Sequence, residues 1–184
     1  MKDQERSIFR ELLGWIVYFV ILIAAVYLLI TFVGQRTKVS GQSMEPTLYN
    51  NDNLIVDKIS YRFREPERYE IIVFPYEHKE NTYYIKRIIG MPGETVQVAD
   101  GAVYIDGELL SDEHYGKEAM LDPGIAREPI TLGEDEYFVL GDNRNHSADS
   151  RDPSVGVLQR EVINSGMNSG LAWFHANQQV NKQT

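Results

Sequence analysis

An uncharged run near the N-terminus constrains this chain more than any other feature. Residues 12–35 contain no charged side chain, and residues 15–33 are almost wholly apolar. A helix needs about 20 such residues to cross the ~30 Å hydrocarbon core of a bilayer. A cleaved secretory signal has a shorter apolar core, and residues 31–35 form a poor cleavage site. A buried helix of a soluble domain would carry one polar face. The sequence therefore predicts a retained transmembrane anchor over residues 12–35.

The charges beside this run set its expected orientation. Three basic residues precede it (Lys2, Arg6 and Arg10), and two follow closely (Arg36 and Lys38). Lysine and arginine are enriched on the cytoplasmic side, while acidic residues count little. The margin is small, but it favours a cytoplasmic N-terminus. We expect residues 1–11 in the cytoplasm and the rest of the chain on the outer face of the plasma membrane.

Composition excludes several classes of chemistry. The chain of 184 residues has no cysteine, so disulfides, thiolate nucleophiles and sulfur-ligated zinc are absent. Its 27 acidic and 18 basic residues give a net charge of −9, which lies outside the first 35 residues. Such an acidic domain is a poor candidate for sequence-independent nucleic-acid binding or for charge-driven binding to anionic lipid. No histidine pair has HExxH spacing, and we expect no metal and no cofactor.

The rest of the chain has mostly β-strand patterns. Short runs rich in β-branched and aromatic residues are bounded by glycine, proline and aspartate turns. The expected strands cover residues 53–56, 69–74, 82–90, 94–98, 102–105 and 136–140. We predict a mainly β domain over residues 36–176, built as a coiled antiparallel sheet or barrel-like fold. Residues 111–128 are polar and read as an excursion, and residues 177–184 as a flexible tail.

Ser43 lies outside any periodic run, between Gly41 and Pro46. Glycine allows another backbone to approach closely, and proline fixes the direction in which the chain leaves. A serine hydroxyl becomes a good nucleophile when a nearby base takes its proton. An ordinary loop serine is the alternative, because serine is common in turns.

Lys86 can be such a base only when it is neutral. An exposed lysine is neutral about one part in a thousand near pH 7.4. On a strand over residues 82–90, Tyr84, Lys86 and Ile88 share one face, and both faces of the strand are half apolar. Burial of the amine between such neighbours would lower its pKa. The alternative is a lysine that extends along the surface and keeps its ammonium in water.

A third polar segment lies at residues 141–151, GDNRNHSADSR. It contains two aspartates, two arginines and two serines. Ser147, Asp149 and Arg151 alternate, so an extended chain would present them on one side. A serine can orient an amine, and an aspartate–arginine pair can stiffen the loop. A solvated polar turn is the alternative.

Together these segments resemble type I signal peptidase, the bacterial leader peptidase, in the short single-span form of Gram-positive bacteria. The resemblance rests on GQSMEPTL at residues 41–48, YIKRIIGMPGE at 84–94 and GDNRNHSADSR at 141–151, with a weaker match at 51–56. The segments occur in the family's order behind an N-terminal span. The resemblance covers essentially the whole chain.

The resemblance implies a membrane-bound serine endopeptidase with a serine–lysine dyad. Ser43 would be the nucleophile, with its backbone N–H as an oxyanion donor, and Lys86 the general base. Ser147 would position the lysine amine, while Asp149 and Arg151 would brace the site. The substrates would be secreted preproteins whose signal peptides carry small residues at −3 and −1, and the secretion machinery would lie nearby.

The resemblance extends to substrate contacts and also shows departures. Arg87 would be structural, and we expect Gln42, Met44 and Tyr84 to contact the substrate, which binds as an added strand. Some members have a serine two residues before the nucleophile whose hydroxyl helps bind the oxyanion. Here that position is Gly41, which leaves the second donor open. Residues 163–167 also differ from the stretch that often follows in the family.

Three other readings remain open at this point. His146 beside Asp142 or Asp149 could form a serine–histidine triad. A self-cleaving repressor-type serine–lysine peptidase is disfavoured by the span and by the lack of a DNA-binding domain. A membrane-tethered β module that binds without catalysis, including an inactive homologue, belongs to a different class.

Overall fold

The structure is a computed structural model that describes residues 2–57, 61, 63–111, 114–116 and 118–168. The chain divides into two compact units, Met1–Gly34 and Gln35–Thr184. The expected tail over residues 177–184 lies outside the described residues, as does part of the excursion at 111–128.

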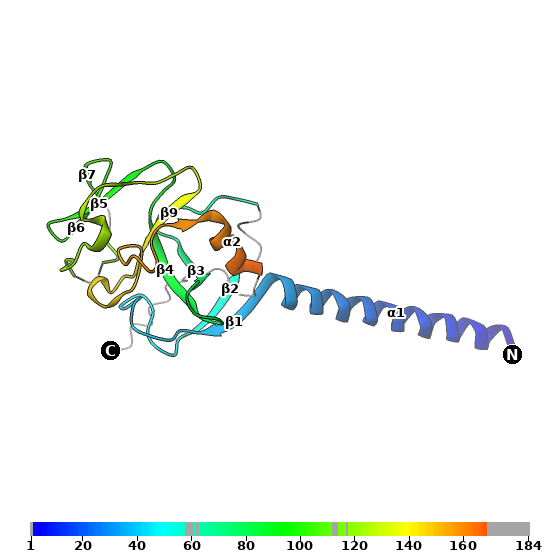
Figure 1. Cartoon of the computed structure of the whole chain (residues 1–184). Helices are drawn as coiled ribbons and strands as arrows, with labels where there is room; N and C mark the ends of the chain where they lie inside the picture. The colour runs from blue at the N-terminus through cyan, green and yellow to red at the C-terminus, as the bar shows by residue number, and fades with distance from the viewer. Residues whose placement is uncertain (1, 58–60, 62, 112–113, 117, 169–184) are drawn as a thin grey trace. The chain divides into compact units, whose positions relative to one another are not determined.

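The first unit is one long helix, α1 (Lys2–Val33) (Figure 1). At 1.5 Å per residue its 32 residues extend about 48 Å. Within it, Arg10–Tyr27 is long and apolar enough to cross a membrane, judged by length and composition. The apolar residues are distributed all round the helix, which suits a hydrocarbon environment.

The second unit is built from short antiparallel strands. Its described strands form a two-stranded sheet β1-β2 and two four-stranded sheets, in the orders β10-β9-β4-β3 and β7-β6-β5-β8. The strands are β1 (Gly34–Lys38), β2 (Asn53–Asp57), β3 (Ile71–Pro75), β4 (Tyr83–Gly90), β5 (Thr95–Ala99), β6 (Ala102–Ile105), β7 (Glu108–Leu109), β8 (Ile130–Thr131), β9 (Glu136–Leu140) and β10 (Leu158–Gln159).

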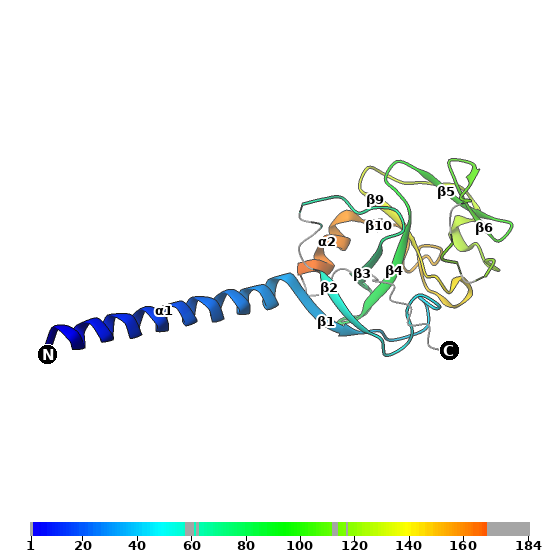
Figure 2. The same cartoon turned by 180° about the vertical axis from the view of Figure 1, so that it is seen from behind.

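The mainly β class predicted from the sequence is confirmed, but the described sheets do not close into a barrel. Both four-stranded sheets end in strands of only two residues on at least one side, β10 in one and β7 and β8 in the other. Strands this short offer few backbone groups for a closing ladder. Figures 1 and 2 show β5 and β6 at one end of this unit, and β1 and β2 at the other.

Turns fix the register of the strands that follow β4. Gly93, with φ +81°, occupies the left-handed position expected for the turn at residues 91–94. The two predicted hairpin turns have positive φ at both central residues: Asp100 and Gly101, then Asp106 and Gly107. This is the pattern of the tight turns that match the twist of a hairpin.

Three helical segments among the described residues were not expected from the sequence. The 3₁₀-helix η2 (Gly124–Arg127) lies within the excursion, the 3₁₀-helix η3 (Arg144–His146) lies in the polar segment 141–151, and α2 (Arg160–Asn168) follows β10. The side chain of Ile163 is buried with Phe74, Tyr137 and Leu158 in the core beside β3. α2 has only nine residues, and a helix this short is marginal without tertiary packing, so its length alone gave no expectation of a helix.

Strand β4 is the centre of the site-bearing sheet. It pairs with β3 from Tyr83 to Arg87, whereas its pairing with β9 begins only at Arg87. Among the described strands, the first half of β4 therefore lacks a partner on its β9 side. Its second half is buried from Lys86 to Gly90, as the two half-apolar faces predicted.

Candidate active site

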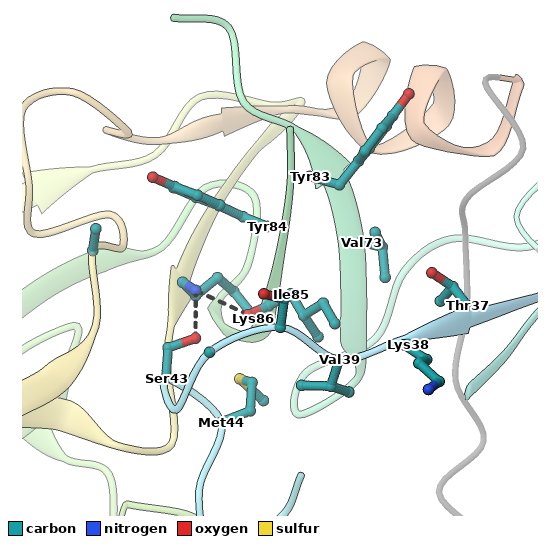
Figure 3. A pocket seen from close by; sticks show the side chains of 13 residues that line it. Thr37, Lys38, Val39, Ser43, Met44, Val73, Tyr83, Tyr84, Ile85 and Lys86 are labelled. Atoms are coloured by element: carbon teal, nitrogen blue, oxygen red, sulfur yellow. Dashed lines mark hydrogen bonds between the residues drawn. The ribbon is translucent and has the colours of Figure 1, made fainter. Parts of the chain in front are cut away.

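The register of β4 brings Lys86 into contact with Ser43. The Nζ atom lies 3.0 Å from the Ser43 Oγ and 3.0 Å from the carbonyl oxygen of Ile85 (Figure 3). The Lys86 side chain is 3% exposed. When the amine is neutral, one N–H donates to Ile85 while the lone pair accepts the hydroxyl proton of Ser43. The contact with Ile85 thus leaves the lone pair for the serine.

Burial changes the protonation of this amine. Loss of water lowers the pKa of Lys86 from 10.5 to about 8, while the charges of Asp149 and Asp142 act in the opposite direction. The amine also lies 5.0 Å from the centre of the Tyr84 ring, whose face favours a cation. Desolvation outweighs these effects, so about one tenth of the chains carry a neutral Lys86 at pH 7.

Apolar side chains anchor the Ser43 loop to the core. Met44 and Leu48 are buried with Leu54 and Ile71 in one cluster. Backbone bonds shape the loop, including one from the Leu48 N–H to the Met44 carbonyl. The Glu45–Pro46 peptide is cis. Ser43 itself is half-buried, at the edge of this packed base.

Arg87 joins several segments behind the pair of Ser43 and Lys86. Its guanidinium forms a two-point contact with Asp142, with Nε–Oδ1 at 2.8 Å and Nη2–Oδ2 at 2.6 Å. It also donates to the Tyr69 carbonyl at 2.7 Å and lies over the Tyr115 ring. The Thr47 hydroxyl donates to the same carboxylate, which ties the Ser43 loop to β4. A buried carboxylate with these donors is fully compensated.

Asp149 and Arg151 form a second buried pair. Arg151 Nε and Nη2 both lie 2.9 Å from the Asp149 carboxylate, which also accepts the Gly141 N–H at 3.1 Å. Arg151 donates further to the carbonyls of Arg144 and Asp122. These bonds fold residues 141–151 into a compact turn that contains the 3₁₀-helix η3 (Arg144–His146). Residues 147–151 thus belong to this turn rather than to a regular strand, although the backbone of Ser147 itself is extended.

Ser147 lies in this turn without the contact expected from the resemblance. Its Oγ is buried and has no hydrogen-bond partner among the described residues, and Lys86 donates elsewhere. The hydroxyl packs against Gly141, where an added Cβ would overlap both the Ser147 Oγ and the Ser43 carbonyl oxygen. Ser147 is thus adjacent to the segment that carries Ser43, but the structure shows no bond from it to the lysine.

A cavity of about 340 Å³ opens beside Ser43 and Lys86. It is lined by residues 37–41, Ser43, Met44, Val73, residues 83–86 and Ala148. Two of the expected substrate contacts, Met44 and Tyr84, line it. Gln42 is exposed and is not among the lining residues. The unpaired half of β4 forms one wall, so the cavity presents backbone groups as well as apolar side chains (Figure 3).

Several contributors were missed in the sequence. Asp142 was considered only as a partner of His146, yet it binds Arg87, and His146 is exposed. Thr47 and Asn143 contact the site from segments whose motifs were recognised, but no role was expected for them. Their contacts join residues 95 to 101 positions apart, and spacing along the chain does not reveal such pairs.

Comparison with known proteins gives a consistent result. The family model described as "Signal peptidase, peptidase S26" matches residues 12–169. The chain is 35% identical to signal peptidase I P of Bacillus subtilis subsp. natto, over 89% of this chain and 90% of the relative. It is 45% identical to probable signal peptidase I-2 of Synechocystis sp. over 72% of this chain, and this match spans 61% of that relative's length.

Solved structures also include similar chains. One of them is a crystal structure of a signal peptidase I from Enterococcus faecalis, with 34% sequence identity and a TM-score of 0.45. The match covers 54% of this chain and 94% of that one.

Proposed function

The chain belongs to the signal peptidase family, peptidase S26, and is therefore a hydrolase of the signal peptidase class, and we propose that it removes signal peptides with a Ser43–Lys86 dyad. The observation that carries this proposal is the 3.0 Å contact between the Lys86 Nζ and the Ser43 Oγ. A lysine buried beside a serine, with a pKa near 8, fits a general base better than a structural cation.

Acylation starts from neutral Lys86. Its lone pair takes the Ser43 proton as the hydroxyl attacks the carbonyl carbon of the −1 residue. The oxyanion that forms is held by the Ser43 N–H, which has no acceptor among the described residues. Lys86, now an ammonium, gives its proton to the amine of the mature protein, and that amine leaves as the ester forms.

In deacylation Lys86 is again the base, water is the nucleophile, and the Ser43 oxygen is the leaving group. Neutral Lys86 removes a proton from water as the water attacks the ester carbon. The Ser43 oxygen leaves and takes the proton back from the lysine. The signal peptide departs with a new carboxyl group, which releases its proton to solvent, and the dyad returns to its starting state.

The substrate enters the cavity beside β4 in an extended conformation. The free edge of Tyr83–Lys86 offers backbone donors and acceptors to an added strand. Met44, Tyr84 and Val73 form a limited apolar space, which suits small side chains at −1 and −3. Gln42 contacts the substrate from the exposed side of the loop.

The remaining expected residues act around this dyad. Arg87 fixes β4 to the neighbouring loops through Asp142, and Asp149 with Arg151 holds the turn that carries Ser147. Ser147 orients the lysine amine when bound substrate displaces the contact between the amine and the Ile85 carbonyl. This last role agrees with its buried hydroxyl, which lacks a described partner.

The anchor sets where cleavage occurs. Residues 1–11 lie in the cytoplasm, residues 12–35 cross the bilayer, and residues 36–176 work on the outer face near the secretion machinery. From Val33 to Ser43 the chain spans ten residues, at most about 36 Å when extended. The nucleophile therefore stays near the surface at which a signal peptide's cleavage site emerges. This raises the effective concentration of the cleavage site at the enzyme.

The test is digestion of a preprotein by the purified full chain. Wild type should release a signal peptide after a residue with a small side chain, with the site read by mass spectrometry. Ser43→Ala and Lys86→Arg should fold and yet leave the preprotein intact, because arginine keeps its proton. Turnover by either variant near the wild-type rate would refute the dyad.

A further inference from the structure

Asn143 holds the backbone on both sides of the nucleophile. Its own N–H donates to the Ser43 carbonyl at 3.0 Å, and its side-chain Nδ2 donates to the Gln42 carbonyl at 3.1 Å. One residue, 100 positions later in the chain, thus binds both carbonyl groups next to Ser43.

The bond to Gln42 bears directly on the oxyanion. The Gln42 carbonyl and the Ser43 N–H belong to one planar trans peptide, in which they point in opposite directions. A donor that fixes the carbonyl on one side therefore fixes the direction of the N–H on the other. It also polarises the peptide, so the N–H becomes a stronger donor.

Asn143 is placed firmly enough for this task. It is 1% exposed, and the preceding Asp142 is locked to Arg87. Its Oδ1 is buried with no hydrogen-bond partner among the described residues. A leucine of similar size would avoid that unpaired oxygen but could not donate to Gln42.

We propose that Asn143 is a positioning residue that aims the Ser43 N–H at the oxyanion of the reaction. The inference rests on the proposed function, because it requires Ser43 to be the nucleophile. It also reduces the need for a hydroxyl at position 41, where this chain has glycine, since the peptide donor is itself pre-oriented.

Two substitutions remove the side-chain donor in different ways. Asn143→Leu keeps the size and the neutral charge, whereas Asn143→Asp replaces the amide NH₂ with an oxygen that repels the Gln42 carbonyl. We expect kcat to fall about 10–100-fold in both, with KM within about threefold. Rates are compared on the alkaline plateau, so that a raised lysine pKa in the aspartate variant does not account for the loss.

A pair of inhibitors distinguishes a loss of oxyanion stabilisation from damage to the substrate cavity beside β4. A peptide aldehyde with a small terminal side chain forms a hemiacetal with Ser43 and uses the oxyanion donor, whereas the matching peptide alcohol does not. The variants should bind the aldehyde about 10–100-fold more weakly and the alcohol within twofold. An equal loss of affinity for both compounds would overturn the proposal and indicate a distorted substrate cavity.

Asn145→Asp is the matched control. It makes the same change of charge two positions away, where the side chain bonds to Leu121 and Ala119 outside the dyad. Its kcat should remain within threefold of wild type. Ser43→Ala in the same assay separates the two proposals: if it cleaves, the proposed function fails, whereas if it is inactive while a folded Asn143→Leu is fully active, only this inference fails.

A crystal structure of the wild-type chain with the aldehyde bound tests the same idea without substitutions. We expect the hemiacetal oxygen within hydrogen-bond distance of the Ser43 N–H, with Asn143 Nδ2 still on the Gln42 carbonyl. A Gln42 carbonyl turned away from Asn143, or an oxyanion bound elsewhere, would overturn the proposal even if both variants failed to fold.

Discussion

Burial of the Lys86 side chain has a cost that depends on pH. The pKa is about 8 in the folded chain, against 10.5 for an ordinary lysine. Because the unfolded chain binds the proton more tightly, the cost is fully present below pH 8 and disappears as pH rises towards 10.5. The difference corresponds to about 3 kcal/mol of lost folding stability at pH 7.

A neutral isostere at this position should therefore stabilise the chain. We predict that Lys86→Met raises the free energy of unfolding by about 1–3 kcal/mol at pH 7, and that the gain shrinks between pH 8 and 10.5. Chemical unfolding at several pH values measures both effects, with the exposed Lys79→Met as control. A gain that is absent at pH 7, or equal at pH 7 and 10.5, would contradict the burial cost.

Gly141 occupies a position where any side chain interferes with the site. An added Cβ would overlap the Ser147 hydroxyl and the Ser43 carbonyl oxygen. We predict that Gly141→Ala lowers kcat about 100-fold, because misplacement by about 1 Å is enough for such a loss. The control is Gly133→Ala, where the added Cβ meets only the flexible end of Glu136. Wild-type kcat in Gly141→Ala would show that the loop adapts freely.

At the residue scale, the sequence predicted the pair of Ser43 and Lys86 more readily than the residues that support it. Ser43 and Lys86 lie in distinctive segments, and the apolar neighbours of the lysine indicated a lowered pKa. The role of Asn143 was not predictable, because a turn asparagine commonly bonds to its own backbone rather than to a distant loop. The Ile85 group that contacts the amine is a backbone carbonyl. Every residue has such a group, so the sequence could not indicate this contact.

Among the elements, β4 depends on the buried pair of Arg87 and Asp142. The two side chains are 5% and 0% exposed, so removing one leaves an uncompensated charge. We predict that Arg87→Met costs about 3–5 kcal/mol of folding stability, whereas Arg87→Met with Asp142→Asn costs less than the sum of the single changes.

Thermal and chemical unfolding of the four chains of this cycle measure the coupling. The half-exposed Arg160, paired with Glu65, serves as control, and Arg160→Met should cost at most about 1 kcal/mol. Strict additivity in the cycle would mean that Arg87 and Asp142 contribute independently.

The strands were predicted better than the helices of the β unit. β6 and β9 have the expected bounds, and β2, β3, β4 and β5 shift by one or two residues. β1 was not expected, and its first two residues fall within the anchor predicted over residues 12–35. β7, β8 and β10 have two residues each, too few for an alternating pattern. α2 was missed because its helical form depends on packing against β3.

At the scale of the whole molecule, the sequence predicts the membrane anchor clearly but gives only a weak signal for its orientation in the membrane. The apolar run fixes α1, but the flanking charges differ by a single residue. The absence of cysteine makes orientation measurable. We predict that a membrane-impermeant maleimide labels Leu109→Cys in intact cells and labels Ser7→Cys only after lysis. The opposite pattern would place the β unit in the cytoplasm.

A neutral Lys86 as the base for Ser43 is best tested by measuring the protonation of this lysine in the active enzyme. Lysine-labelled wild type is titrated from pH 6 to 11 by NMR, with the Lys86 signal assigned from its loss in Lys86→Arg, and kcat/KM is measured over the same range. We expect a Lys86 midpoint near pH 8 and a rise in kcat/KM with the same midpoint. A midpoint above pH 10, or activity that does not follow the titration, would contradict a neutral lysine as the base for Ser43.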